Sequence, residues 1–302
     1  MKNIEELNRQ FGIPGVAEFE DGNGDLARLV IAAEGSVAEV YLLGGHVTRW
    51  IPAGGQDVLW LSRASHYEIG KPIRGGIPVC LPWFGPLDGD PSAPIHGYVR
   101  LTCLNVESVA MNDDGSISAV LWRKVEAPPA ENWPGNFELR VRVTVGPSLS
   151  VAAEMLNLGQ RDLVLGEALH TYFRVSDVRK VSVTGLAGAG YWNKVTGARA
   201  VQGPDPLTFA AQTDRVYLNS AGEVVLHDEQ MGRDIRIAKR GSKSTVVWNP
   251  WVEKAAAMPD FGDDEWPEML CIEAANALDD AVPIPPGKMH TMETIISVGP
   301  CK

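Results

Sequence analysis

The sequence predicts an all-β protein built as an antiparallel β-sandwich. Between residues 137 and 145, apolar residues alternate with polar or charged ones, which is typical of a strand with one buried face. Turn-forming groups such as Asp113-Asp114-Gly115 and Gly146-Pro147 separate such runs, and this favours antiparallel hairpins. Strands do not alternate with long amphipathic helices, which argues against a doubly wound α/β fold.

The remaining elements are short. Further β-rich runs are expected at residues 29–43, 101–109, 116–125, 149–156, 181–184, 235–238, 245–248 and 291–298. Asn3 can cap one short N-terminal helix, whose apolar face would consist of Ile4, Leu7 and Phe11. We find no internal repeat and no linker, so we expect a single domain over residues 1–302, with residues 1–24 as a peripheral N-terminal segment.

The bulk composition narrows the class of partner. The chain has 302 residues, 45% of them apolar, and a formal net charge of -11. A molecule this acidic repels nucleic acid and anionic membranes, and no run approaches the roughly 18 apolar residues of a membrane span. The N-terminus has no signal-peptide core, and the four cysteines form no CxxC pair of the zinc or disulfide type. We therefore expect a cytoplasmic protein with no nucleic-acid or membrane partner.

The first candidate site segment begins at Arg74. Two glycines follow this arginine and would let the backbone approach a ligand closely. Trp83 and Phe84 then offer flat apolar surfaces of the kind that packs against a sugar. A surface ion pair for Arg74 and core positions for both aromatic residues are the alternative interpretation.

A second segment places His96 and Arg100 four residues apart, with a glycine between them. Arg74 and Arg100 would together provide two planar guanidinium groups suited to a phosphate dianion. A structural histidine beside a surface arginine is the alternative.

The third and fourth segments each embed one ionisable residue in apolar sequence. His170 is either a hydrogen-bonded core histidine or a general acid with a tuned pKa. Glu273 is preceded by apolar or neutral residues and followed by two alanines. Desolvation should raise the pKa of Glu273, which suits a general base, unless a buried ion pair compensates the charge.

Together these segments resemble the aldose 1-epimerase superfamily and, within it, the hexose-6-phosphate mutarotase (glucose-6-phosphate 1-epimerase-like) branch. The resemblance extends from about residue 44 to residue 286. The matching motifs are Arg74-Gly75-Gly76-Ile77-Pro78, Pro82-Trp83-Phe84-Gly85, His96-Gly97-Tyr98-Val99-Arg100, Leu169-His170-Thr171-Tyr172-Phe173, Thr213-Asp214, Val247-Trp248-Asn249-Pro250-Trp251 and Cys271-Ile272-Glu273. The resemblance implies a galactose-mutarotase-like supersandwich with a shallow sugar cleft across one sheet.

The resemblance also implies roles for individual residues. His170 matches the catalytic histidine of the family and Glu273 the catalytic glutamate. The expected substrate-binding residues are Arg74, Trp83, His96, Arg100, Asp214 and Trp248. One position departs from the pattern: some relatives carry a substrate-contacting glutamine before the histidine of the second segment, and this chain has Ile95 there.

The implied reaction needs only two proton movements. Glu273 would remove the proton of the anomeric O1 hydroxyl and His170 would protonate the ring oxygen O5, so that the ring opens and closes on the other face. The expected substrate is an aldohexose 6-phosphate, with glucose 6-phosphate as the default. We expect no cofactor and no metal, because the chain has no GxGxxG, P-loop or HExxH motif.

Several alternatives remain open. The protein could act on unphosphorylated sugars, or bind sugar without catalysis. A two-carboxylate glycoside hydrolase or lyase would need a second acid, for which the candidates are Asp260, Asp263, Asp264 and Glu265. A metal site would draw on His46, His96, His170 and Glu273, although their spacing is not ligand-like. A monomer is the default expectation for such a sandwich.

Overall fold

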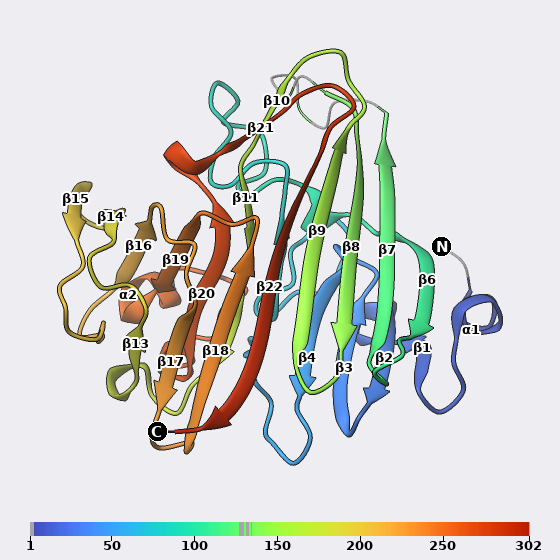
Figure 1. The fold of residues 1–302 in the computed structure, drawn as a ribbon, viewed down its shortest axis with the longest axis horizontal. Helices are drawn as coiled ribbons and strands as arrows, with labels where there is room; N and C mark the ends of the chain where they lie inside the picture. The colour runs from blue at the N-terminus through green and yellow to red at the C-terminus, as the bar shows by residue number, and fades with distance from the viewer. Residues whose placement is uncertain (1–2, 127–129, 131–132, 134, 302) are drawn as a thin grey trace.

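Antiparallel β-strands make up almost all of the regular structure (Figure 1). The computed structural model describes residues 3–126, 130, 133 and 135–301. Its strands form two eight-stranded sheets, one four-stranded sheet and one two-stranded ribbon. This confirms the predicted all-β class. Within the described ranges, no helix has both the length and the apolar character needed to cross a bilayer.

The sheet that carries the site has the strand order β15-β14-β16-β19-β20-β11-β5, and β12 also pairs with β20. We call it the site sheet. Its strands are β5 (Val79–Cys80), β11 (Glu167–Leu169), β12 (Tyr172–Arg174), β14 (Gly190–Asn193), β15 (Ala198–Val201), β16 (Thr213–Tyr217), β19 (Ser244–Asn249) and β20 (Met269–Asn276).

The other eight-stranded sheet, which we call the long sheet, has the order β13-β17-β18-β22-β9-β8-β7-β6. Its strands are β6 (Asn105–Met111), β7 (Ile117–Val125), β8 (Phe137–Val145), β9 (Leu149–Asn157), β13 (Ser182–Thr184), β17 (Val224–Asp228), β18 (Arg233–Arg240) and β22 (Met289–Pro300).

The smaller elements complete the sandwich. The four-stranded sheet runs in chain order through β1 (Ala17–Asp21), β2 (Ala27–Ala33), β3 (Ser36–Tyr41) and β4 (His46–Ile51), and the ribbon pairs β10 (Leu163–Leu165) with β21 (Val282–Ile284). Figure 1 shows the long sheet in front, the site sheet behind one half of it and the four-stranded sheet behind the other. The α-helices are α1 (Ile4–Phe11) and α2 (Trp251–Ala256).

Alternation along the strands builds the core. In β8, the residues expected to point inward are all buried, each with at most 1% exposure: Phe137, Leu139, Val141, Val143 and Val145. Burying one such side chain contributes about 1.5–3 kcal/mol. The predicted strand over these residues is therefore confirmed, with the predicted face inside.

Strand β20 has a different pattern, because all eight of its residues are buried. Ile272 and Ala274 join the main core, whereas Cys271 and Ala275 belong to a second cluster. Successive side chains of a strand point to opposite faces, so Glu273 lies on the face of the second cluster. The pocket described below is therefore on the side of the site sheet that faces away from the main core.

The predicted N-terminal helix capped by Asn3 is confirmed. The Asn3 side chain accepts hydrogen bonds from the backbone amides of Glu5 and Glu6, at 2.7 and 3.2 Å. Residues 1–24, which we expected to be peripheral, contribute α1 and the edge strand β1, and the inward side chains Leu7 and Phe19 of this segment reach the main core.

One predicted strand is in fact two. The run at residues 29–43 forms the hairpin of β2 and β3, which turns at Glu34 and Gly35. Both turn residues have positive φ, 51° and 77°, as two-residue hairpin turns often require. Glutamate is not a typical residue for such a turn, and for this reason the turn was not predicted.

Candidate active site

His170 and Glu273 face each other across the site sheet. Leu169 of β11 pairs with Ala274, and Tyr172 of β12 pairs with Cys271. The antiparallel register is the same on both sides of the gap between β11 and β12, so it places His170 directly opposite Glu273. Directly opposed residues have Cβ atoms about 4.5–5.5 Å apart. The Nδ1 atom of His170 lies 3.4 Å from Oε1 of Glu273.

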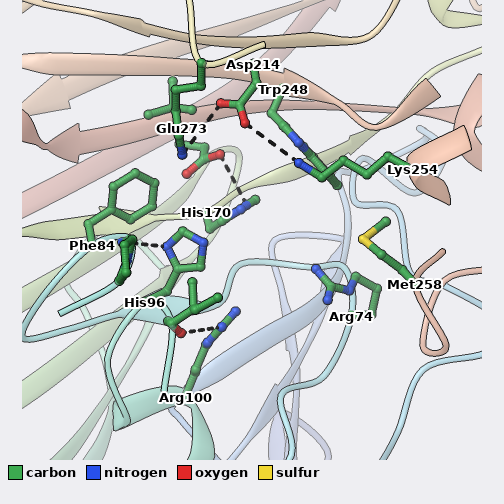
Figure 2. A pocket seen from close by; sticks show the side chains of 15 residues that line it. Arg74, Phe84, His96, Arg100, His170, Asp214, Trp248, Lys254, Met258 and Glu273 are labelled. Atoms are coloured by element: carbon green, nitrogen blue, oxygen red, sulfur yellow. Dashed lines mark hydrogen bonds and ion pairs between the residues drawn. The ribbon is translucent and has the colours of Figure 1, made fainter. Parts of the chain in front are cut away.

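A pocket of about 410 Å³ opens above this pair. Figure 2 shows Asp214 and Lys254 towards one end of it and Arg100 towards the other, with His170, His96 and Glu273 between them. Its lining side chains are charged, aromatic or apolar: Arg74, Phe84, Ile95, His96, Arg100, His170, Lys194, Asp214, Val246, Trp248, Lys254, Met258 and Glu273. The structure thus brings together seven of the eight predicted site residues.

The surroundings of Glu273 disfavour the ionised form of its carboxyl group. The residue is 1% exposed, and its Oε2 atom has no hydrogen-bond partner in the described part of the chain. Burial raises the pKa of Glu273 well above its ordinary value, and the nearby Asp214 carboxylate adds to this, while Lys194 and Arg100 oppose it. Such a group binds a proton readily, as a general base must.

The His170 imidazole has the opposite shift. Burial lowers the pKa of His170 well below its ordinary value, and the positive charges of Arg100 and Arg74 and the nearby His96 lower it further. The two shifts favour a neutral pair in which one proton is available to either the carboxyl group or the imidazole. Such a pair titrates as a unit.

His96 is held by the backbone of its own loop. Its Nδ1 atom accepts a hydrogen bond of 3.1 Å from the Gly85 amide, so the neutral ring carries its proton on Nε2. Burial lowers the pKa of His96 well below its ordinary value, followed by the charge of Arg100. The next residue, Gly97, has φ of 71°, and a Cβ there would lie 1.8 Å from the carbonyl oxygen of Leu81. The loop that presents His96 therefore requires glycine at that position.

Arg100 carries a positive charge that forms no ion pair with a carboxylate in the part of the chain that the structure describes. Its Nη2 atom donates to the carbonyl oxygen of Ile95 at 2.8 Å, and its Nε atom is buried without a partner. No carboxylate of the described residues lies within ion-pair distance of Arg100. The isoleucine that replaces the glutamine of some relatives thus contributes its backbone oxygen and leaves its side chain 57% exposed.

Arg74 differs from Arg100, because its charge is already paired. Its Nε and Nη2 atoms donate to the two oxygens of Asp260 at 3.0–3.2 Å. Its Nη1 atom donates to the Tyr172 hydroxyl at 3.0 Å. The sequence predicted two equivalent guanidinium groups for a phosphate, and the structure provides one that is uncompensated and one that is neutralised.

Two lysines in the pocket were missed by the sequence analysis. The Nζ atoms of Lys194 and Lys254 each lie 3.9 Å from a different oxygen of Asp214. Burial raises the pKa of Asp214, and both lysines oppose this shift. Asp214 pairs in register with Trp248, over whose ring Lys254 lies at 5.8 Å. No local sequence pattern distinguishes these two lysines from the other lysines of the chain. Lys254 lies three residues after the motif at residues 248–251.

Trp83 is the predicted site residue that does not line the pocket. It is 5% exposed, its indole nitrogen donates to the Pro94 carbonyl, and its ring packs against Tyr98 and Trp133. The prediction that Trp83 contacts a sugar is corrected: it belongs to the core, and the neighbouring Phe84 faces the pocket instead.

The residues of the hydrolase alternative do not lie beside Glu273. Asp260 pairs with Arg74, and Glu265 accepts hydrogen bonds from Ser62 and the Arg63 backbone. Asp263 and Asp264 are exposed. The second carboxylate of the pocket is Asp214 from β16.

Of the four residues considered for a metal site, His96, His170 and Glu273 line the pocket and His46 does not. His46 is buried, and its Nε2 atom lies 2.7 Å from the Gly75 carbonyl, outside the pocket lining. A different set, His170, Cys271 and Glu273, has ligand atoms within 4.8 Å of one another. Zinc would need all three about 2.0–2.3 Å from the ion, and burial raises the pKa of the Cys271 thiol, which disfavours the required thiolate.

The fold and the pocket define a mutarotase-like β-sandwich in which a buried histidine and a buried glutamate face each other in a polar pocket. The chain belongs to the aldose 1-epimerase family, whose model matches residues 28–297. This confirms the resemblance seen in the sequence motifs.

Individual relatives support the same family assignment. A protein of Cenchrus ciliaris, provisionally named glucose-6-phosphate 1-epimerase, is 34% identical over 90% of this chain and 84% of its own length. A protein of Escherichia coli with the same provisional name is 36% identical over 80% of each chain. The crystal structure of a provisionally assigned mutarotase from Salmonella typhimurium superposes with a TM-score of 0.86 at 29% identity, covering 98% of this chain and 99% of that one.

Proposed function

We propose that this protein is a sugar-phosphate mutarotase that interconverts the α and β anomers of glucose 6-phosphate or a related aldohexose 6-phosphate. The observation that carries the proposal is the directly opposed pair of His170 and Glu273 in a pocket that also holds the uncompensated Arg100. The names of the relatives support the same substrate class.

The pair supplies both proton transfers of the reaction. In the form of the pair in which the one proton lies on His170, Glu273 takes the proton of the O1 hydroxyl, and His170 gives its proton to O5 as the C1–O5 bond breaks. Rotation about the C1–C2 bond then exposes the other face of the aldehyde. On closure, O5 returns its proton to His170 and O1 regains one from Glu273, so each group is regenerated. One positioned acid or base contributes roughly 10²–10⁴-fold.

The other pocket residues hold the sugar. Asp214 can accept hydrogen bonds from sugar hydroxyl groups, and the Nε2–H group of His96 can donate one. Phe84 and Trp248 provide apolar surface beside them. These assignments follow from the atoms that each residue presents to the pocket.

Arg100 is the group best suited to the phosphate, because its charge is uncompensated. Lys194 and Lys254 add positive charge to the same pocket. This local charge counters a formal net charge of -11, since fields of distant surface charges are screened beyond about 8 Å at physiological salt.

Two other functions would fit part of this site. A mutarotase for unphosphorylated sugars would use the same His170 and Glu273, and the neutralised Arg74 is the observation that favours it. A non-catalytic sugar-binding protein would need the pocket without the acid–base pair.

The test is anomer exchange followed by NMR on glucose 6-phosphate, galactose 6-phosphate, mannose 6-phosphate and glucose. Methyl glucoside 6-phosphate, which cannot open its ring, serves as a binding probe. The proposal predicts faster exchange of at least one hexose 6-phosphate than of glucose, with competitive inhibition by the methyl glycoside. Equal exchange of glucose supports the unphosphorylated alternative, and binding of the probe without any exchange supports the sugar-binding alternative.

A further inference from the structure

A cavity of about 410 Å³ lies apart from the pocket that holds His170, and the two linings share no residue. It is formed by residues 52–56 after β4, residues 231–233 at the start of β18 and residues 298–300 at the end of β22. Figure 1 shows the end of β22 next to the C-terminus, at the lower edge. We propose that this space, the Arg233 cavity, binds an oxyanion, namely the phosphate or carboxylate group of a small molecule.

Arg233 gives the cavity its charge. Among the described residues that line it, no other side chain is charged, and Gln56 is the only other one with a polar side chain. Arg233 is 6% exposed. A buried charge is costly unless a partner compensates it. The lining therefore presents an anion with a positive group and with no carboxylate that would repel it.

The hydrogen bonds of Arg233 use only part of its guanidinium group. Its Nη2 atom donates to the carbonyl oxygen of Arg174 at 2.7 Å, and its Nη1 atom donates to that of Asp57 at 3.3 Å. Its Nε atom is buried and has no partner in the described chain. Because each Nη atom carries two N–H groups, each retains one that can bind a ligand. A buried donor without a protein partner is uncommon, and a bound ion or water is the usual reason for one.

The two carboxylates nearest in effect to Arg233 are engaged by other groups. Asp228 accepts hydrogen bonds from the hydroxyl and the amide of Ser176, at 2.6 and 2.7 Å. Asp57 has Nε of Arg49 3.5 Å from its second oxygen. Neither carboxylate lies within ion-pair distance of Arg233 in the described structure. An external oxyanion would therefore not have to displace a carboxylate from Arg233.

Arg174 brings a second positive charge to the same place. Burial lowers the pKa of Arg233; Asp228 and Asp57 oppose this shift, and the charge of Arg174 adds to it. No ion pair among the described residues includes either arginine. An oxyanion bound to Arg233 would supply the counter-charge, and arginine suits phosphate and carboxylate groups because its N–H groups match their geometry.

The walls of the cavity leave room for a ligand. Four of its lining residues are glycines. A Cβ atom added at Gly299 would meet no other atom within 4 Å, so the end of β22 borders open space. The other lining side chains are apolar except those of Arg233 and Gln56. The cavity thus suits a compact molecule that carries one oxyanion group.

Arg233 also connects three sheets. It belongs to β18 of the long sheet, and its two hydrogen bonds reach β12 of the site sheet and the segment that follows β4 of the four-stranded sheet. A ligand that holds Arg233 therefore adds to the cohesion of all three sheets at this end of the sandwich.

Two variants remove the site by different routes. Arg233→Gln removes the charge. Gly299→Leu fills the cavity and leaves Arg233 in place, and the position has the space for a side chain and no positive φ. Gly203→Leu is the matched control for the second, since it also borders open space but lies outside the cavity. Arg199→Gln is the control for the first, because Arg199 pairs with Asp279 on the surface.

Inorganic phosphate and acetate are titrated separately into the ¹⁵N-labelled protein, and the amide signals of Gly54 and Gly232 are followed by NMR. The proposal predicts saturable shifts with at least one anion. The apparent dissociation constant should rise about 10- to 100-fold in Arg233→Gln and in Gly299→Leu, and should change less than twofold in both controls. Tighter binding of phosphate identifies a phosphate group as the ligand chemistry, and tighter binding of acetate identifies a carboxylate.

The amide of Gly85 lines the pocket of His170 and reports binding there in the same titration. If neither anion shifts Gly54 and Gly232, the Arg233 cavity holds water only and the proposal is overturned. Shifts that persist unchanged in both variants show an adventitious ion only, which also overturns it. If Arg233→Gln does not fold, Gly299→Leu still decides. The outcome is independent of mutarotation, so a wild type that exchanges no sugar would contradict the proposed function and leave this site untouched.

Discussion

Nδ1 of His170, in the short gap between β11 and β12, lies 3.4 Å from Oε1 of Glu273 on β20. Their separation is set by the register with which β11 and β12, on either side of His170, pair with β20. One group is shifted towards losing a proton and the other towards keeping one. The account of this protein as a mutarotase depends on that pair.

Replacing the acid should remove most of the activity. His170→Ala is expected to reduce kcat about 10²–10⁴-fold, because it deletes the proposed proton donor to O5. The measurement is the rate of anomer exchange at saturating substrate. His227→Gln is the control, since that histidine pairs with Asp234 in the long sheet and should keep full activity. A loss in the control as large as that in His170→Ala would point to general destabilisation.

Arg100 should determine the preference for phosphorylated sugars. A hydrogen bond to a charged group contributes about 1.5–3 kcal/mol, so Arg100→Ala should lower kcat/KM for glucose 6-phosphate about 10- to 100-fold and leave glucose nearly unaffected. Steady-state kinetics on both sugars measures this split. Arg142→Ala, a half-exposed arginine on β8, should change neither value. Equal losses on both sugars would show that Arg100 does not contact the phosphate.

The pH dependence should follow the shifted pair. Activity needs one proton on the pair, so it falls at acid pH, when both groups are protonated, and at alkaline pH, when neither group is. Because the pKa of His170 is lowered and that of Glu273 raised, the acid limb should lie well below the ordinary histidine value of about 6.5. A kcat–pH profile with a phosphate-free control substrate measures this. An acid limb at the ordinary value would contradict the buried, neutral imidazole.

Removing the buried carboxylate should stabilise the fold. The folded-state pKa of Glu273 is raised above its unfolded value, so ionisation favours the unfolded chain, and stability is lost as pH rises from the ordinary value through the raised one. Glu273→Gln should therefore raise the free energy of unfolding by about 1 kcal/mol near neutrality and by less near pH 4. Thermal melts at both values test this. A variant that is less stable at neutral pH would mean that the carboxylate has a partner.

The sequence predicted the elements whose burial alternates. Phe137–Val145 is a strand with one buried face, and its period of two is visible in the sequence. Strand β20 could not be found in this way, because both of its faces are buried and the alternation disappears. The sequence analysis therefore predicted no strand there and singled out only the motif that contains Glu273.

The sequence predicted most of the residues that line the pocket, but it did not predict how their charges pair. His170 and Glu273 stood out as ionisable residues in apolar sequence, and the sheet brings them together. The pairing of Arg74 with Asp260 joins residues far apart in the chain, and no local pattern reveals it. The same holds for Lys194 and Lys254, which become pocket residues only through the fold.

The most direct test of the central claim is two-dimensional NMR exchange between the anomers of glucose 6-phosphate, recorded with wild type, with Glu273→Gln and with buffer alone. The glutamine keeps the size of the side chain and removes its ability to accept the O1 proton. The account predicts that the wild type accelerates exchange well above buffer and that Glu273→Gln, folded by its thermal melt, loses about 100-fold or more. Exchange with the variant as fast as with the wild type would contradict the assignment of Glu273 as the base.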